Sequence, residues 1–182
     1  MGMHQNYEGE DQRREYSRVE AYVPFEYRIV APGETGNIKA RISGNTAATE
    51  FRPIPDLGEN DPIFGEWMKL LNAKLDTILR LLTLQREGYC GLSYKTVNIS
   101  GGGMSFPLPD LLPLGETLEI KLTLTLQQPV VLCIYGEVVK ADRRDKGCFI
   151  AVHYVHMEDS IRDEIIRFVF EREREIIREK RR

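Results

Sequence analysis

The part of this sequence best suited to bind a ligand is a run of three glycines between residues that favour β-strands. Gly101, Gly102 and Gly103 carry no side chains, so their backbone N–H groups could approach an anion closely. Asn98 and Ser100 stand just ahead of them and would add an amide and a hydroxyl. The same pattern also suits an ordinary β-hairpin turn, so by itself it fits either role.

A pair of arginines far upstream offers complementary chemistry. Arg14 and Arg18 stand four residues apart in a polar leader, directly before a β-like segment. The planar guanidinium fits phosphate oxygens or the O6/N7 edge of guanine, and it also stacks on purine faces. The spacing alone says little, because 25 Lys and Arg occur among 182 residues. The informative feature is the order: the arginine pair, a strand, the glycine run, further strands and a terminal helix.

This ordered set resembles the PilZ domain, the bacterial receptor for cyclic di-GMP. In that family an Arg-x-x-x-Arg pair and an [Asp/Asn]-x-Ser-x-x-Gly turn form the two halves of the nucleotide site. The resemblance covers roughly residues 13–170, apart from an insertion. The positions that match the two motifs are Arg14, Arg18, Asn98, Ser100 and Gly103.

The resemblance implies a receptor that binds cyclic di-GMP between the arginine arm and the turn and signals to an unknown partner. Gly101 and Gly102 would let the ligand approach the backbone. A third guanidinium, on Arg13, could stack on a guanine and support a ligand dimer, giving two ligands per chain. Ala151 stands where the family often has glycine, a change expected to affect packing more than ligand contact.

The elements that must position these residues are mainly strands. Alternating apolar residues predict about six short strands, which suit a small antiparallel barrel, and residues 31–61 should be mostly loop. We therefore predict a mainly β fold: a six-stranded antiparallel PilZ-like barrel, an inserted long helix and a C-terminal helix. The predicted division is a flexible arm at 1–18, the barrel domain at 19–170 with its inserted helix at 62–87, and a charged helix end at 171–182.

The inserted helix is the clearest helix of the sequence. Asp61 could cap it, Pro62 suits its first turn, and Gly88 suits its end. Its heptad seam consists of Phe64, Met68, Leu71, Leu75, Ile78 and Leu82. A second apolar row widens this surface and consists of Ile63, Trp67, Leu70, Leu81 and Leu84. The helix could lie across its own barrel, but one small barrel cannot cover both rows, so we predict homo-oligomerisation. Such an insertion resembles the tetrameric branch of PilZ-like proteins, some of which have lost the nucleotide motifs.

The terminal helix should begin at a capping box formed by Ser160 and Asp163. Its predicted inner face consists of Ile161, Ile165, Phe168 and Val169. From Glu171 onward the helix is dominated by Glu and Arg, a pattern that is typical of a solvated face.

Composition excludes several classes of function. A net charge of -3 argues against nucleic-acid binding, and the sequence shows no catalytic nucleophile–base pair and no Walker lysine, so we expect a protein that is not an enzyme. The absence of a long apolar run and of a signal peptide predicts a cytoplasmic protein without membrane insertion. We expect reduced cysteines, no cofactor and no metal, even though Cys148 lies near His153 and His156. The alternative function is an oligomeric adaptor that does not bind nucleotide.

Overall fold

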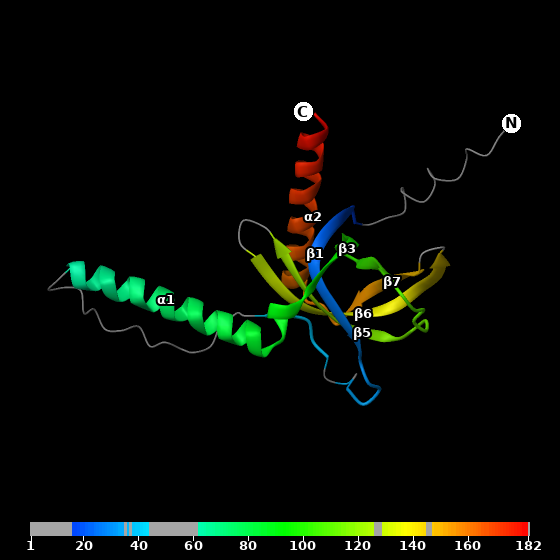
Figure 1. The fold of residues 1–182 in the computed structure, drawn as a ribbon, viewed down its shortest axis with the longest axis horizontal. Coiled ribbons are helices and arrows are strands. Elements are labelled where there is room, and N and C mark those ends of the chain that lie inside the picture. The colour runs from blue at the N-terminus through cyan, green and yellow to red at the C-terminus, as the bar shows by residue number, and fades with distance from the viewer. Residues whose placement is uncertain are drawn as a thin grey trace.

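A computed structural model gives the fold of the chain, and it describes residues 16–34, 36, 38–43, 62–125, 129–144 and 147–181 (Figure 1). Within these residues, antiparallel strands form one sheet of order β2-β6-β5-β1-β3-β4-β7, and β6 also pairs with β7. That last pairing closes six of the strands into a barrel, which confirms the predicted six-stranded fold and leaves β2 as an extra strand. The strands are β1 (Arg18–Ile29), β2 (Arg41–Ile42), β3 (Ser93–Ser100), β4 (Gly103–Leu108), β5 (Thr117–Thr125), β6 (Pro129–Arg144) and β7 (Gly147–Val155).

The core lies inside the barrel and is filled by alternate residues of the six barrel strands. On β5 the alternation is complete: Leu118, Ile120, Leu122 and Leu124 are all fully buried. The strands therefore turn every second residue outward. On β1, β3 and β4 those outward positions include Glu20, Asn98 and Ser105, each between two core residues, and Arg18, which begins β1 directly before the core residue Val19.

Helix α2 (Asp159–Lys180) covers part of the barrel beside β1, β3 and β5 with the four residues predicted for its inner face. The predicted capping box is wrong. The chain turns sharply at His156 (φ 52), and the backbone carbonyl of Glu158 already accepts the N–H groups of Ile161 and Arg162. Ser160 is thus inside the first turn, and the N-cap residue Glu158 makes no side-chain cap bond.

Helix α1 (Pro62–Arg86) projects away from the barrel, as Figure 1 shows. Gly88 ends it in the left-handed conformation (φ 84), as predicted, and the short helix η3 (Tyr89–Gly91) follows. The alternative that α1 lies across its own barrel is wrong: on the predicted seam, Leu71, Leu75 and Ile78 are about half exposed (49%, 48% and 52%). Asp61, the predicted cap, lies outside the described residues.

The base of α1 is nevertheless fixed to the barrel. The Lys121 ammonium of β5 donates to the backbone carbonyl of Glu87 at 2.5 Å, and the buried Tyr89 hydroxyl lies 2.7 Å from the Ser43 hydroxyl. Cys133 and Cys148 are buried free thiols, as predicted, whereas Cys90 is a free thiol on the surface. No helix in the described part of the chain is long and apolar enough to cross a bilayer.

Candidate ligand-binding site

Pairing of β1 with β3 brings the second arginine of the motif to the glycine turn, which we define as residues 101–103. In the antiparallel register Arg18 lies opposite Ser100, and Glu20 lies opposite Asn98. Residues far apart in the sequence are therefore cross-strand neighbours, with Cβ atoms about 4.5–5.5 Å apart. Arg13 and Arg14 lie outside the described residues, so their placement at the site stays a prediction.

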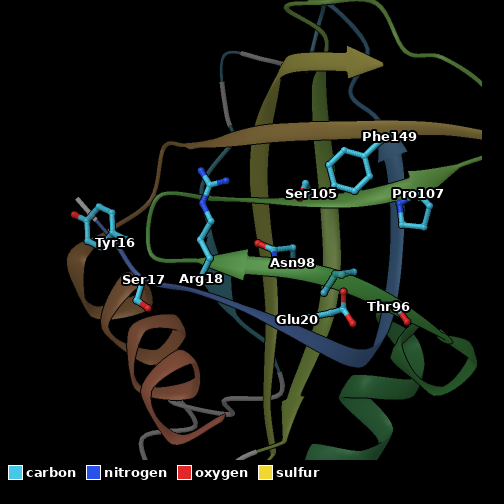
Figure 2. Close-up of a pocket in the computed structure, with 10 residues that line it drawn as sticks. Tyr16, Ser17, Arg18, Glu20, Thr96, Asn98, Ser105, Pro107 and Phe149 are labelled. Carbon is cyan, nitrogen blue, oxygen red and sulfur yellow. The ribbon is translucent and has the colours of Figure 1, made fainter. Parts of the chain in front are cut away.

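An open pocket of about 860 Å³ lies on the outer face of the barrel at this point, within the size range of small-molecule sites. Figure 2 shows the side chains that line it, with Arg18, Asn98 and Ser105 side by side and Tyr16 beside the turn. Strands β1, β3, β4 and β7 contribute its walls. The lining residues are Tyr16, Ser17, Arg18, Glu20, Thr96, Val97, Asn98, Ser105, Pro107 and Phe149.

The strand register arranges the polar residues of this pocket in a row. Glu20 lies opposite Asn98, Asn98 opposite Ser105, and Ser105 opposite Ala151. The row runs across four strands and presents a carboxylate, an amide and a hydroxyl in succession. Ala151 continues the row but does not line the pocket.

Unlike Arg18 and Asn98, the motif residue Ser100 does not line the pocket. It is buried, and its hydroxyl donates to the backbone carbonyl of Gly103 at 3.0 Å. In the described structure this hydroxyl therefore holds the turn together and does not line the pocket. The prediction that Ser100 also contacts a ligand stays a prediction.

Close packing, and not unusual backbone dihedrals, explains the three glycines, because none of them has a positive φ. A Cβ atom on Gly103 would lie 2.3 Å from the backbone oxygen of Val152, a distance that no side chain tolerates. A Cβ on Gly101 would meet Tyr16 and Ile166 at 2.7 and 2.8 Å. The glycine turn is thus packed closely between β7 on one side and Tyr16 and α2 on the other.

Sequence reasoning missed two residues that contact the glycine turn, Arg162 and Tyr16. Arg162 of α2 donates to the carbonyl of Gly101 at 2.6 Å, and its guanidinium lies 5.9 Å from the centre of the Tyr16 ring. Next to Tyr16, the Ser17 hydroxyl donates to the Glu173 carboxylate of α2. The last residues of the predicted arm are therefore attached to α2. Only the position of Tyr16 inside the arginine motif could have signalled this role.

Sequence reasoning also missed Glu20 as a residue of the pocket, although the alternation of β1 places it on the same face as Arg18.

A buried tyrosine, Tyr154, also contacts the glycine turn. The backbone N–H of Tyr154 donates to the carbonyl of Gly102 at 3.1 Å, while its hydroxyl has no hydrogen-bond partner in the described structure. Burial raises the pKa of Tyr154, an effect that the positive charge of Arg162 opposes only in part. Arg162 thus supplies fixed positive charge behind the turn.

Comparison with known proteins bears on the family and the fold of this chain. The PilZ domain family model matches residues 79–171, from the last turns of α1 into α2, and leaves β1 outside the match. A solved structure from Xanthomonas campestris is similar over 90% of this chain and 91% of its own, at 22% identity and a TM-score of 0.57. It is described as a tetrameric PilZ domain that self-assembles through an unusual helical bundle. A search of curated proteins gave no match.

Proposed function

This chain belongs to the PilZ domain family, and from that premise we propose that it is a receptor for cyclic di-GMP that binds the dinucleotide in the pocket between β1 and the glycine turn. The observation that carries the proposal is the β1–β3 register, which sets Arg18 beside the residues Asn98–Gly103. The family model does not include β1. The pairing of β1 with β3 therefore supports the proposal independently of the family model.

The chemistry of the pocket suits this ligand. Cyclic di-GMP carries two phosphates and two guanines, and the guanidinium of Arg18 can pair with either. Asn98 offers an amide that both donates and accepts, and Arg14, four residues before Arg18, would add a second guanidinium for the ligand. The proposed role is binding without catalysis, with the ligand joining the N-terminal segment to the barrel. A receptor for this intracellular messenger would act in the cytoplasm.

We also propose that α1 assembles the protein into a homo-oligomer. Both apolar rows of α1 carry large exposed side chains, among them Trp67 (68%), Leu81 (58%) and Leu82 (55%). A helix with this much exposed apolar surface is stabilised when it packs against other helices. The similar structure from Xanthomonas campestris, with its helical bundle, supports this proposal.

An oligomeric adaptor without nucleotide remains the second candidate, because the exposed rows of α1 would serve it equally well. Calorimetric titration of the full chain with cyclic di-GMP separates the two, with GTP and cyclic AMP as controls. The receptor proposal expects binding of cyclic di-GMP alone. No heat and no binding at high micromolar ligand would leave the adaptor as the function.

Arginine substitutions test whether the ligand uses this pocket. Hydrogen bonds to charged groups contribute about 1.5–3 kcal/mol, so Arg14→Ala or Arg18→Ala should each weaken binding at least about tenfold. Arg181→Ala, at the far end of α2, is the matched control and should bind as the wild type does (Figure 1). Equal affinity of all these variants would place the ligand elsewhere.

A further inference from the structure

A carboxylate stands inside the pocket proposed for an anionic ligand. Glu20 lines the same pocket as Arg18, two residues along β1, and its side chain is exposed there. Among the described residues no side chain forms an ion pair or hydrogen bond with this carboxylate. Close to a phosphate, such a group would repel the ligand. Its presence is favourable only if the nearby part of the ligand donates hydrogen bonds.

The cross-strand neighbour of Glu20, Asn98, indicates which hydrogen-bond donors and acceptors that part of the ligand must carry. Asn98 lies directly opposite Glu20 in the β1–β3 register, so the two side chains can contact one planar group together. An ionised carboxylate only accepts hydrogen bonds, whereas the amide of Asn98 can donate one. The pair therefore matches an edge that carries an acceptor next to donors.

Guanine has such an edge. Its Watson–Crick side presents the O6 acceptor beside the N1–H and N2–H donors. Adenine presents a donor at N6 and a lone pair at N1, and that lone pair would face the carboxylate. A site that offers a carboxylate to N1–H and N2–H would therefore disfavour adenine, because the carboxylate would face the N1 lone pair and would accept no hydrogen bond from it.

Two apolar residues of β4 and β7 provide a surface on which the guanine base could stack. Pro107 of β4 lies opposite Phe149 of β7, and both line the same pocket. Figure 2 shows their rings together at the end of the pocket away from Tyr16. They form an apolar surface on which a planar base can lie while its edge points to the polar row.

We propose that Glu20 is a specificity-determining residue that reads the N1–H and N2–H donors of one guanine, with Asn98 donating to O6 of the same base. This inference rests on the proposed function, because it concerns the same pocket. It goes further in assigning the choice of base to a residue outside both family motifs. Arg18 then remains available for a phosphate or for the second guanine.

Calorimetric titration of full-length wild type and Glu20→Gln with three cyclic dinucleotides tests the inference. The ligands are cyclic di-GMP, its inosine analogue that lacks N2–H, and cyclic di-AMP. Loss of a carboxylate that accepts two hydrogen bonds should weaken cyclic di-GMP binding on the order of 10- to 100-fold. Binding of the inosine analogue should weaken less, and binding of cyclic di-AMP should not weaken. Glu26→Gln, an exposed carboxylate on the same face of β1 but outside this pocket, is the control and should change nothing.

The outcomes distinguish failure of the receptor proposal from failure of the Glu20 inference alone. If wild type binds none of the cyclic dinucleotides, both the receptor proposal and this inference fail. If wild type binds cyclic di-GMP and Glu20→Gln binds it equally well or more tightly, only the inference fails. An equal loss for all three ligands would also overturn it, because that result indicates a general effect on the pocket. Thermal unfolding of the variants confirms that each is folded.

Discussion

At the scale of single residues, the site depends on how tightly the glycine turn is held. Gly103 has no room for a side chain, since the obstacle to a Cβ is the backbone oxygen of Val152. Gly102 differs, because the atoms nearest its Cβ position belong to the ring of Tyr16, at 3.2 Å, and a ring can move. The two neighbouring glycines therefore offer a matched pair for substitution.

Gly103→Ala should lower the free energy of unfolding by about 1–3 kcal/mol, because the added methyl group must push two paired strands apart. Gly102→Ala should cost clearly less. Urea unfolding followed by circular dichroism measures both. A smaller loss for Gly103→Ala than for Gly102→Ala would contradict the described packing of β4 against β7.

Ser100 shows where reading single residues from the sequence reaches its limit. Alternation along β3 places Val97 and Ile99 inside, and by the same alternation Ser100 would point outward, where its hydroxyl could reach a ligand. It is instead buried, because the strand ends there, α2 and Tyr16 cover the turn, and the hydroxyl bonds to Gly103. Local pattern cannot reveal a cover that comes from distant parts of the chain.

At the scale of elements, sequence periodicity predicted well what depends on one segment alone. The ends of α1, the strands β5 and β7 and the inner face of α2 follow from apolar spacing and from Gly88. Contacts between distant segments were not predictable in this way. The attachment of Tyr16 and Ser17 to α2 through Arg162 and Glu173 has no signal in local spacing. That the arginine motif and the glycine turn belong to one site despite the insertion was implied only by the family resemblance, and the pairing of β1 with β3 is a finding of the structure.

The apolar seam of helix α1 is predicted to hold the homo-oligomer together. Replacing Leu71, Leu75 and Ile78 together by Glu should reduce the molar mass measured by light scattering, because three charges would enter the helix–helix contact. The strands should keep their circular dichroism signal, since α1 contributes nothing to the barrel core. Lys69→Glu with Lys74→Glu, at exposed polar positions of the same helix, is the control. A wild type that is monomeric at high micromolar concentration would contradict the oligomer.

At the scale of the whole molecule, β1 connects the proposed ligand pocket to the neighbouring strand β5. Its first half pairs with β3 at the pocket, and its second half pairs with β5. There the Glu119 carboxylate accepts hydrogen bonds from Arg28 (3.1 and 3.0 Å) and from the Tyr135 hydroxyl (2.9 Å). This network joins three strands on the outer face of the barrel.

The network predicts a pH dependence of stability. Burial alone would raise the pKa of the Glu119 carboxyl, but the hydrogen bonds from Arg28 and Tyr135 outweigh it and hold this pKa below its usual value. A lowered pKa in the folded state gives stability that is present above the unfolded value of about 4.3 and is lost as pH falls through the folded value. Wild type should therefore lose stability more steeply below about pH 5 than Glu119→Gln does.

Urea unfolding at pH 7, 5, 4 and 3 measures this difference. Glu137→Gln, at an exposed position of β6, is the control and should follow the wild-type curve. Parallel curves for wild type and Glu119→Gln would show that Glu119 contributes no pH-dependent stability.

The central claim is that the arginine motif and the glycine turn act as one site because β1 and β3 are paired. A double-mutant cycle on the affinity for cyclic di-GMP tests it most directly, with Arg18→Ala, Asn98→Ala and the two combined in calorimetric titrations. Residues that hold the same ligand in one pocket should be coupled, so the double variant should lose less binding free energy than the sum of the single losses, by about 0.5 kcal/mol or more. Strictly additive losses, or an Arg18→Ala variant that binds as tightly as wild type, would contradict the account.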